Sequence, residues 1–273
     1  MKKSKEKIKG SIKRNIAIMD TPLMSILPGQ ISFFVILSII PLISILVMII
    51  SKLSINYEII TGVISHYLPG GISSVILSVF EEQKAGVFDI VFIITAFYLA
   101  SKATHSVIVA STHIYNGEQK GFLRTRIKAI LMLIILVFLV VVLIVVLTFG
   151  NKLINYLTLV NGTIHPVIYW TYKILRLPFV IFMAFLSVKM IYTISPNTNI
   201  PSKSVNKGAL FTTFVGAIST YAYSFYATNI ANYTKFYGNL SNIIILMIWI
   251  YWLCYIFVFG MTLNEYGLKN KEK

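Results

Sequence analysis

One short run of residues places a lysine, a histidine and several hydroxyl groups inside an otherwise apolar stretch. Its polar members are Ser101, Lys102, Thr104, His105 and Ser106. Lys102 and His105 are three residues apart, so on a helix they share one face. A basic, hydroxyl-rich face of this kind could bind a phosphate or a carboxylate. The alternative is structural: the helix ends near this run, and the lysine stem carries its ammonium group to water.

A second group interleaves amide side chains with tyrosines. It consists of Asn229, Asn232, Tyr233 and Tyr237. This mixture could line a polar entrance for a sugar or a lipid headgroup. The alternative is an aromatic belt, because tyrosine is enriched where membrane helices meet water.

Patterns typical of enzymes and metal sites do not occur. None of the nine acidic residues lies deep in a long apolar block, and the four histidines lack metal-ligand spacing. The zinc-protease, nucleophile-elbow and phosphate-loop motifs are all missing from the sequence. Cys254 is the single cysteine, so an intramolecular disulfide is impossible. The sequence therefore predicts a protein that is not an enzyme and that uses no cofactor or metal.

The elements that must position these residues are long apolar blocks. Hydrophobic types make up 57% of the 273 residues and charged types only 12%, whereas about 25% of a soluble domain is charged. Uncharged blocks at 31–50, 129–150 and 240–264 reach the ~20 residues that a helix needs to span a bilayer. They lack the apolar–polar alternation of membrane β-strands. The predicted fold class is all-α, a polytopic helical membrane protein.

Six transmembrane helices are predicted. They lie at about residues 25–50, 87–112, 129–150, 174–194, 208–230 and 240–263. With both termini inside, 18 of the 24 lysines and arginines fall on the inner side and 6 on the outer side, as the positive-inside rule requires. The long first outer segment, 52–86, is expected to hold short interfacial helices.

The membrane domain is predicted to cover residues 25–264. A basic segment, 1–24, precedes it in the cytoplasm, either as an amphipathic surface helix or as a solvated tail. A short basic cytoplasmic tail, 265–273, follows it.

Four residues are candidates for structural hinges: Pro41, Pro196, Gly208 and Gly238. Proline removes a backbone donor, so Pro41 is expected to kink or break the first span. Ser38 is expected to help satisfy the freed carbonyls. The fifth span carries a stripe of small residues, which predicts close helix packing. The stripe consists of Ala209, Thr213, Gly216, Thr220 and Ser224.

Several motifs occur in an order and at spacings that resemble a known family. The strongest runs from Asn229 to Leu240 as N-x-x-x-Y-x-x-x-Y-G-x-L, and Trp249 and Tyr251 follow it as W-x-Y. Together with weaker matches along the chain, these motifs resemble the YihY/BrkB family of bacterial inner-membrane proteins. One departure is Thr262, which stands where the family has a glutamate. The resemblance implies a six-helix membrane protein and says little about activity, since members have been linked to RNA cleavage, virulence and envelope-lipid transport.

Three lysines are predicted near the inner ends of spans, namely Lys102, Lys189 and Lys207, and together they could form a basic pocket for an anionic headgroup. We therefore expect a transporter-like protein of the bacterial cytoplasmic membrane that binds or moves an anionic lipid or an envelope precursor. The alternative is a non-catalytic scaffold of the envelope. Membrane lipids are the expected partners. Despite the net charge of +15, nucleic acid is not expected, because the basic residues cluster between spans.

Overall fold

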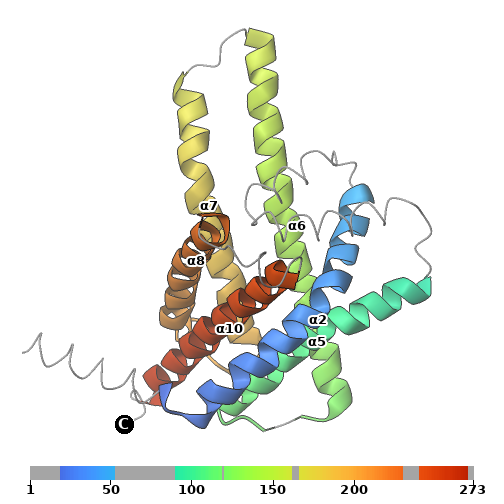
Figure 1. Cartoon of the computed structure of the whole chain (residues 1–273), viewed down its shortest axis with the longest axis vertical. Helices are drawn as coiled ribbons and strands as arrows, with labels where there is room; N and C mark the ends of the chain where they lie inside the picture. Colours follow the sequence, from blue (N-terminus) through green and yellow to red (C-terminus); the bar gives the residue numbers. More distant parts are fainter. Residues whose placement is uncertain (1–18, 53–89, 119, 162–165, 230–239, 270–273) are drawn as a thin grey trace, which may run out of the picture.

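The computed structural model describes residues 19–52, 90–118, 120–161, 166–229 and 240–269. Within these ranges it contains six long helices (Figure 1). They are α2 (Pro22–Lys52), α5 (Ile90–Ile114), α6 (Phe122–Asn161), α7 (Pro166–Ile194), α8 (Asn206–Asn229) and α10 (Leu240–Lys269). The regular structure of the described residues is entirely helical, which confirms the predicted all-α class. The predicted interfacial helices in 52–86 lie outside the described residues. Only Lys52 of this segment is described, as the last residue of α2.

Four of the described helices contain stretches long and apolar enough to cross a membrane. The stretches are Pro22–Ile39, Phe122–Leu147, Ile174–Ile194 and Ile244–Leu268. Helices α5 and α8 are outside this set; α5 carries the polar run around Lys102, and α8 is rich in threonine, serine and tyrosine. A helical protein with several apolar spans is therefore established, whereas six crossings and cytoplasmic termini stay predictions.

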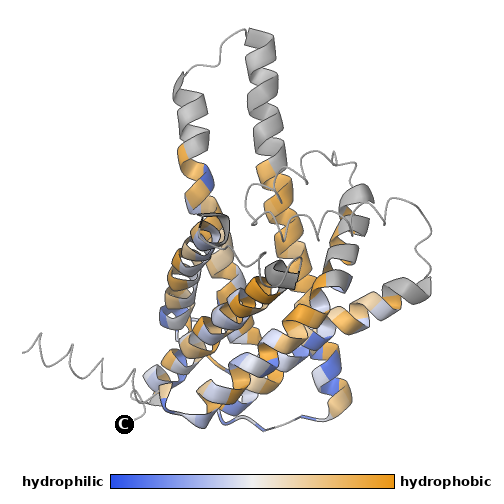
Figure 2. Ribbon diagram, in the orientation of Figure 1, coloured by the Kyte–Doolittle hydropathy of each residue, from blue (hydrophilic) through white to orange (hydrophobic). Residues whose placement is uncertain are grey.

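The outer surface of the bundle supports contact with lipid. Large apolar side chains are exposed on all six described helices, including Phe33, Ile94, Phe138, Leu177, Ile218 and Ile248. Hydrophobic colour runs over the faces of α2, α6 and α10, while hydrophilic residues gather at the end of the bundle near the α5–α6 turn (Figure 2). Exposed apolar patches of this extent favour a hydrocarbon environment.

Helix α6 is longer than predicted at both ends. Its 40 residues give a length of about 60 Å, roughly twice the hydrocarbon thickness of a bilayer. The predicted span 129–150 is therefore only its middle part. Helix α7 packs beside α6, and the two form the tall pair in Figure 1.

Helix α2 lies at the centre of the packing. It contacts α5 and α10 extensively, α10 also packs on α8, and α5 also packs on α6. The main core contains buried residues from these elements, such as Ile31 of α2, Ile108 of α5 and Val258 of α10. Two helices far apart in the sequence, α2 and α10, thus form one core with α5.

Helix α2 continues through both Pro28 and Pro41, so Pro41 does not break it, and a kink at Pro41 stays a prediction. Ser38 also has a different role from the one expected. Its hydroxyl is 2.6 Å from the Phe34 carbonyl and 3.1 Å from the Leu99 carbonyl of α5, so it links α2 to α5. It does not bond to the Leu37 carbonyl, which Pro41 leaves without its helical donor.

Helices α8 and α10 cross at two glycines, Gly208 and Gly260, which we call the glycine crossing. A methyl group on Gly208 would overlap the Gly260 carbonyl and the Asn264 side chain, and one on Gly260 would overlap the Thr212 hydroxyl. The Gly208 N–H donates to Asn264 Oδ1 at 2.7 Å. Gly208, predicted as a hinge, therefore lies where two backbones approach closely, as glycine permits.

Tyr192 of α7 joins the same crossing. Its side chain is fully buried, and its hydroxyl donates to the Phe257 carbonyl of α10 at 2.6 Å. The same oxygen lies 2.7 Å from the Thr212 hydroxyl of α8. One phenol thus connects three helices through buried hydrogen bonds.

Candidate functional site

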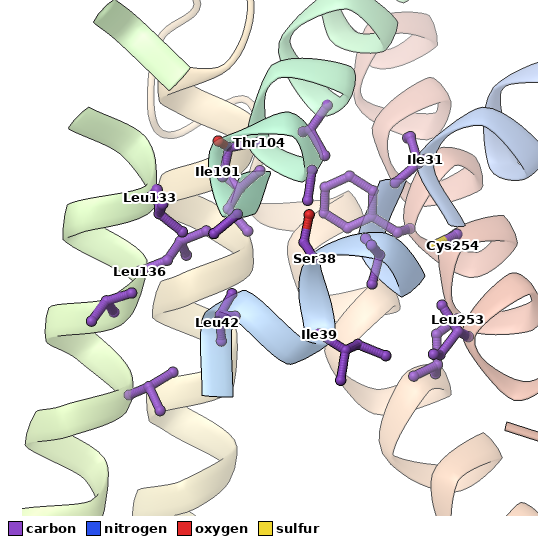
Figure 3. A pocket seen from close by; sticks show the side chains of 18 of the residues that line it. Ile31, Ser38, Ile39, Leu42, Thr104, Leu133, Leu136, Ile191, Leu253 and Cys254 are labelled. Carbon is purple, nitrogen blue, oxygen red and sulfur yellow. The ribbon is translucent and has the colours of Figure 1, made fainter. Parts of the chain in front are cut away.

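A cavity of about 590 Å³ lies among α2, α5, α6 and α10 (Figure 3). We refer to it as the cavity. This volume is within the range of roughly 300–1,000 Å³ for small-molecule sites. The labelled side chains of α2 lie between those of α6 and those of α10 in Figure 3. Lining residues include Ile31, Ser38 and Leu42 from α2, Leu133 and Leu136 from α6, and Leu253 and Cys254 from α10.

The cavity wall is almost entirely hydrocarbon, and no charged side chain lines it. Its two hydroxyl groups are already hydrogen-bonded, Ser38 as described above and Thr104 to the Ala129 carbonyl of α6 at 2.8 Å. The indole N–H of Trp249, another lining residue, is buried and has no hydrogen-bond partner in the described part of the chain. The wall thus suits an apolar ligand with at most one or two acceptor oxygens.

The sequence of α5 explains why this space stays open. Ala100, Ala103, Thr104 and Val107 line the cavity, and their spacing of three and four residues places them on one face. Two of the four side chains are single methyl groups. They do not fill the distance to α2 and α6.

Val140 of α6 lines the cavity and is 37% exposed. It lies eleven residues after Ala129, where the third span is predicted to begin, or about 16 Å along the helix. Measured from that predicted boundary, Val140 is near the middle of a hydrocarbon core of ~30 Å. A partly exposed lining residue at such a depth would let a ligand enter sideways from the bilayer.

The predicted residues Lys102 and His105 do not line the cavity. With Tyr98 they follow a spacing of four and three on α5, which places them on the helix face opposite Ala100, Ala103 and Val107. Lys102 Nζ lies 5.7 Å from the centroid of the Tyr98 ring. The neighbouring hydroxyls of Ser101 and Ser106 donate to carbonyls within their own helix turn.

The three predicted lysines lie on three different helices. Lys207 is exposed at the start of α8, and Lys189 lies beside Phe185 within α7, with Nζ 6.0 Å from the ring centroid. The basic pocket that they could form with Lys102 stays a prediction.

Lys128 fixes the chain at the end of α7, and the sequence did not predict this role. Its Nζ donates to the carbonyls of Ser195 and Pro196, at 2.9 and 2.7 Å, and to Asn197 Oδ1 at 3.2 Å. A lysine at the last carbonyls of a helix also complements the helix dipole. Pro196, predicted as a hinge, is therefore buried beneath this clamp.

Of the predicted amide–tyrosine group, only Asn229 lies in a described helix, as the last residue of α8. Asn232, Tyr233, Tyr237 and the candidate hinge Gly238 lie outside the described residues. The nearby Tyr223 stacks on Trp249 with ring centroids 5.2 Å apart. The polar entrance and the aromatic belt both stay predictions.

Among the described residues, no group of three or more His, Cys, Asp and Glu side chains could hold a metal ion.

Thr262, at the position where the resembling family has a glutamate, donates its hydroxyl to the Val258 carbonyl at 2.7 Å. Glu265 is buried near Tyr115. Burial of the Tyr115 phenol itself is the main cause that raises the pKa of this tyrosine. Tyr115 therefore stays protonated, 3.4 Å from the Met261 carbonyl.

Comparison with known proteins identifies relatives over most of the chain. The family model described as "Virulence factor BrkB" matches residues 23–273. A protein of Bacillus subtilis (strain 168), YfkH, described only as ribonuclease-like, is 26% identical over 255 residues, which cover 89% of this chain and 90% of YfkH.

UPF0761 membrane proteins match a shorter region. The one from Enterobacter sp. (strain 638) is 29% identical over 34% of this chain and 33% of its own length. YihY of Salmonella arizonae is 30% identical over 31% of this chain and 30% of its own length. No solved structure matches the chain.

Proposed function

Because the chain belongs to the BrkB virulence factor family, whose relatives include membrane proteins, we propose that it binds the acyl or isoprenoid chains of a membrane lipid in the cavity. The observation that carries the proposal is an apolar cavity of about 590 Å³ whose lining includes the partly exposed Val140 of α6. Apolar pockets of this size bury a large part of a ligand's surface. A ligand confined to the bilayer meets the opening without first crossing water.

The bound lipid is proposed to be anionic, either a phospholipid or an envelope precursor, and binding is one step in moving it. Support comes from the net charge of +15 and from the excess of basic residues expected on one side of the membrane. The proposed location is the cytoplasmic membrane, crossed six times, with both termini in the cytoplasm. The ribonuclease-like description of YfkH is not carried over, because the cavity wall offers no carboxylate or histidine, and a hydrolytic nuclease needs such groups to hold metal ions and activate water.

Photo-crosslinking tests the cavity directly. The protein would be placed in nanodiscs that contain a phospholipid with a photoreactive group on its acyl chain, and labelled residues would be identified by mass spectrometry. We expect labels on cavity-lining residues of α6 and α10, such as Leu136 and Leu253. Leu136→Trp fills the cavity and should reduce these labels to background.

The matched control is Leu131→Trp, because Leu131 is an exposed leucine on the same helix that does not line the cavity. This variant should leave the cavity labels unchanged, and equal melting temperatures would show that both variants fold. Labels confined to exposed residues and insensitive to Leu136→Trp would contradict lipid binding in the cavity. That outcome would favour the scaffold alternative.

A further inference from the structure

Arg126 of α6 is a buried cation, only 8% exposed, at the contact between α5 and α6. Its Nη2 donates to the Tyr98 carbonyl at 2.8 Å, and its guanidinium carbon lies 4.1 Å from the centroid of the Tyr98 ring. Its Nε is also buried and has no hydrogen-bond partner in the described part of the chain. Part of the guanidinium fork thus lacks the acceptor that a buried donor requires.

Two further polar side chains lie around the same tyrosine. Lys102 Nζ lies 5.7 Å from the centroid of the Tyr98 ring, and His105 lies on the same face of α5, three residues after Lys102. No ion pair with a carboxylate is made by any of the three within the residues that the structure describes. Because a buried charge is normally paired, the buried guanidinium of Arg126 lacks an anion.

The surroundings of this cluster are apolar and accessible. Tyr98 is 48% exposed, and Phe122, Ile127 and Leu131 of α6 are more than half exposed. The Phe122 ring lies 6.5 Å from the His105 ring. Arg126 is four residues after the start of α6, or about 6 Å along the helix. A tyrosine with basic neighbours at a helix end, beside exposed apolar residues, is typical of the membrane interface.

We propose that Tyr98, Lys102, His105 and Arg126 form a binding site for the phosphate of an anionic phospholipid, on the outer face of α5 and α6. The headgroup phosphate accepts hydrogen bonds from Arg126 and Lys102, and the acyl chains lie along the exposed Ile127 and Leu131. This site faces away from the cavity, on the opposite side of α5, so it goes beyond the lipid-chain site proposed above and does not depend on it.

A lipid fits the site better than a soluble anion, because the exposed residues next to the cations are apolar. A free phosphate would leave Phe122, Ile127 and Leu131 without a partner, whereas the acyl chains of a phospholipid cover them. Arginine is also suited to phosphate, since its planar fork presents several donors at once.

The test compares retention of two lipids. The full chain would be purified from vesicles containing equal amounts of phosphatidylglycerol and phosphatidylcholine, and the bound lipids would be counted by mass spectrometry. The buffer contains about 0.5 M NaCl, so that the diffuse attraction of exposed cations is largely screened. We expect the wild type to retain phosphatidylglycerol preferentially. Arg126→Gln and Lys102→Gln should each lower that preference about fivefold.

Arg124→Gln is the matched control, because it removes the same charge from an exposed position on the same helix and should leave the preference unchanged. If Arg126→Gln does not fold, the loss of preference in Lys102→Gln still tests the site. Equal preference in all variants would overturn the site. If excess sodium phosphate at constant ionic strength abolishes the preference, the site takes free phosphate and the lipid assignment fails. The comparison is repeated in a Leu136→Trp background, where the cavity is filled; the losses caused by Arg126→Gln and Lys102→Gln should persist there, which separates this site from the cavity.

Discussion

The two halves of α10 differ in how closely they pack. Its C-terminal half meets α8 at the glycine crossing, where backbones nearly touch and Asn264 and Tyr192 make buried hydrogen bonds. Its N-terminal half borders the cavity from Leu246 to Cys254, and Phe257, just beyond the middle of the helix, contacts both regions. One helix is therefore fixed at one end and borders open volume at the other. A ligand can be accommodated where side chains leave space, while the crossing keeps α7, α8 and α10 together.

The largest expected effect comes from breaking the glycine crossing with Gly260→Ala. The new methyl group would overlap the Thr212 hydroxyl and approach the Tyr192 hydroxyl and the Gly208 carbonyl. Since two backbones and a buried hydroxyl cannot easily move, we expect the free energy of unfolding to fall by about 3 kcal/mol. Unfolding by SDS titration, followed by circular dichroism, measures this change.

Gly267→Ala provides the control for that variant, because Gly267 lies seven residues later on α10 with no atom within 4 Å of the added methyl group. Alanine is the better helix former by about 1 kcal/mol, so this variant should be as stable as the wild type or more so. If the two alanine variants have equal stability, the close approach at the crossing is wrong.

A smaller effect is expected when Tyr192→Phe removes one hydroxyl and keeps the ring. The Phe257 carbonyl and the Thr212 hydroxyl lose a buried partner. Phenylalanine retains the contact with the Phe257 ring, whose centroid is 4.8 Å away. We expect a loss of about 1 kcal/mol in the same titration, because hydrogen bonds between membrane helices are modest in strength. Tyr221→Phe alters an exposed tyrosine and should have no effect.

The sequence was sufficient to predict the helical membrane fold, because a long uncharged run such as 129–150 can satisfy its backbone hydrogen bonds within lipid in few other structures. It also predicted close packing of the small residues in α8; Ala209 and Thr213 are buried, whereas Gly216, Thr220 and Ser224 are only partly buried. It could not show that Gly208 faces Gly260, since pairing between helices depends on tertiary geometry. It left open whether Pro41 kinks or breaks the first span, for a similar reason: neighbouring helices can compensate for a proline, and α2 continues through it.

The candidate sites were less predictable. Lys102 and His105 stood out because they interrupt an apolar run, but their face of α5 could not be assigned from one helix alone. The predicted third span begins at residue 129 and so leaves Arg126 out, whereas α6 begins at Phe122 and places Arg126 against Tyr98. The cavity has no sequence signal of its own, because it is the volume left unfilled among side chains of α2, α5, α6, α7 and α10.

The smallest effect is expected for Ala103→Leu beside the cavity. It is compared with the same substitution beside the glycine crossing, Ala209→Leu. Ala209 is fully buried, so three added carbons must displace neighbours and cost about 1–3 kcal/mol. Ala103 lines the cavity, so its leucine side chain enters open volume, and the free energy of unfolding should change by less than about 0.5 kcal/mol. SDS titration of both variants measures the difference. A cost at Ala103 as large as that at Ala209 would mean that the helices close over the cavity in a bilayer, and lipid binding there would then require them to separate first.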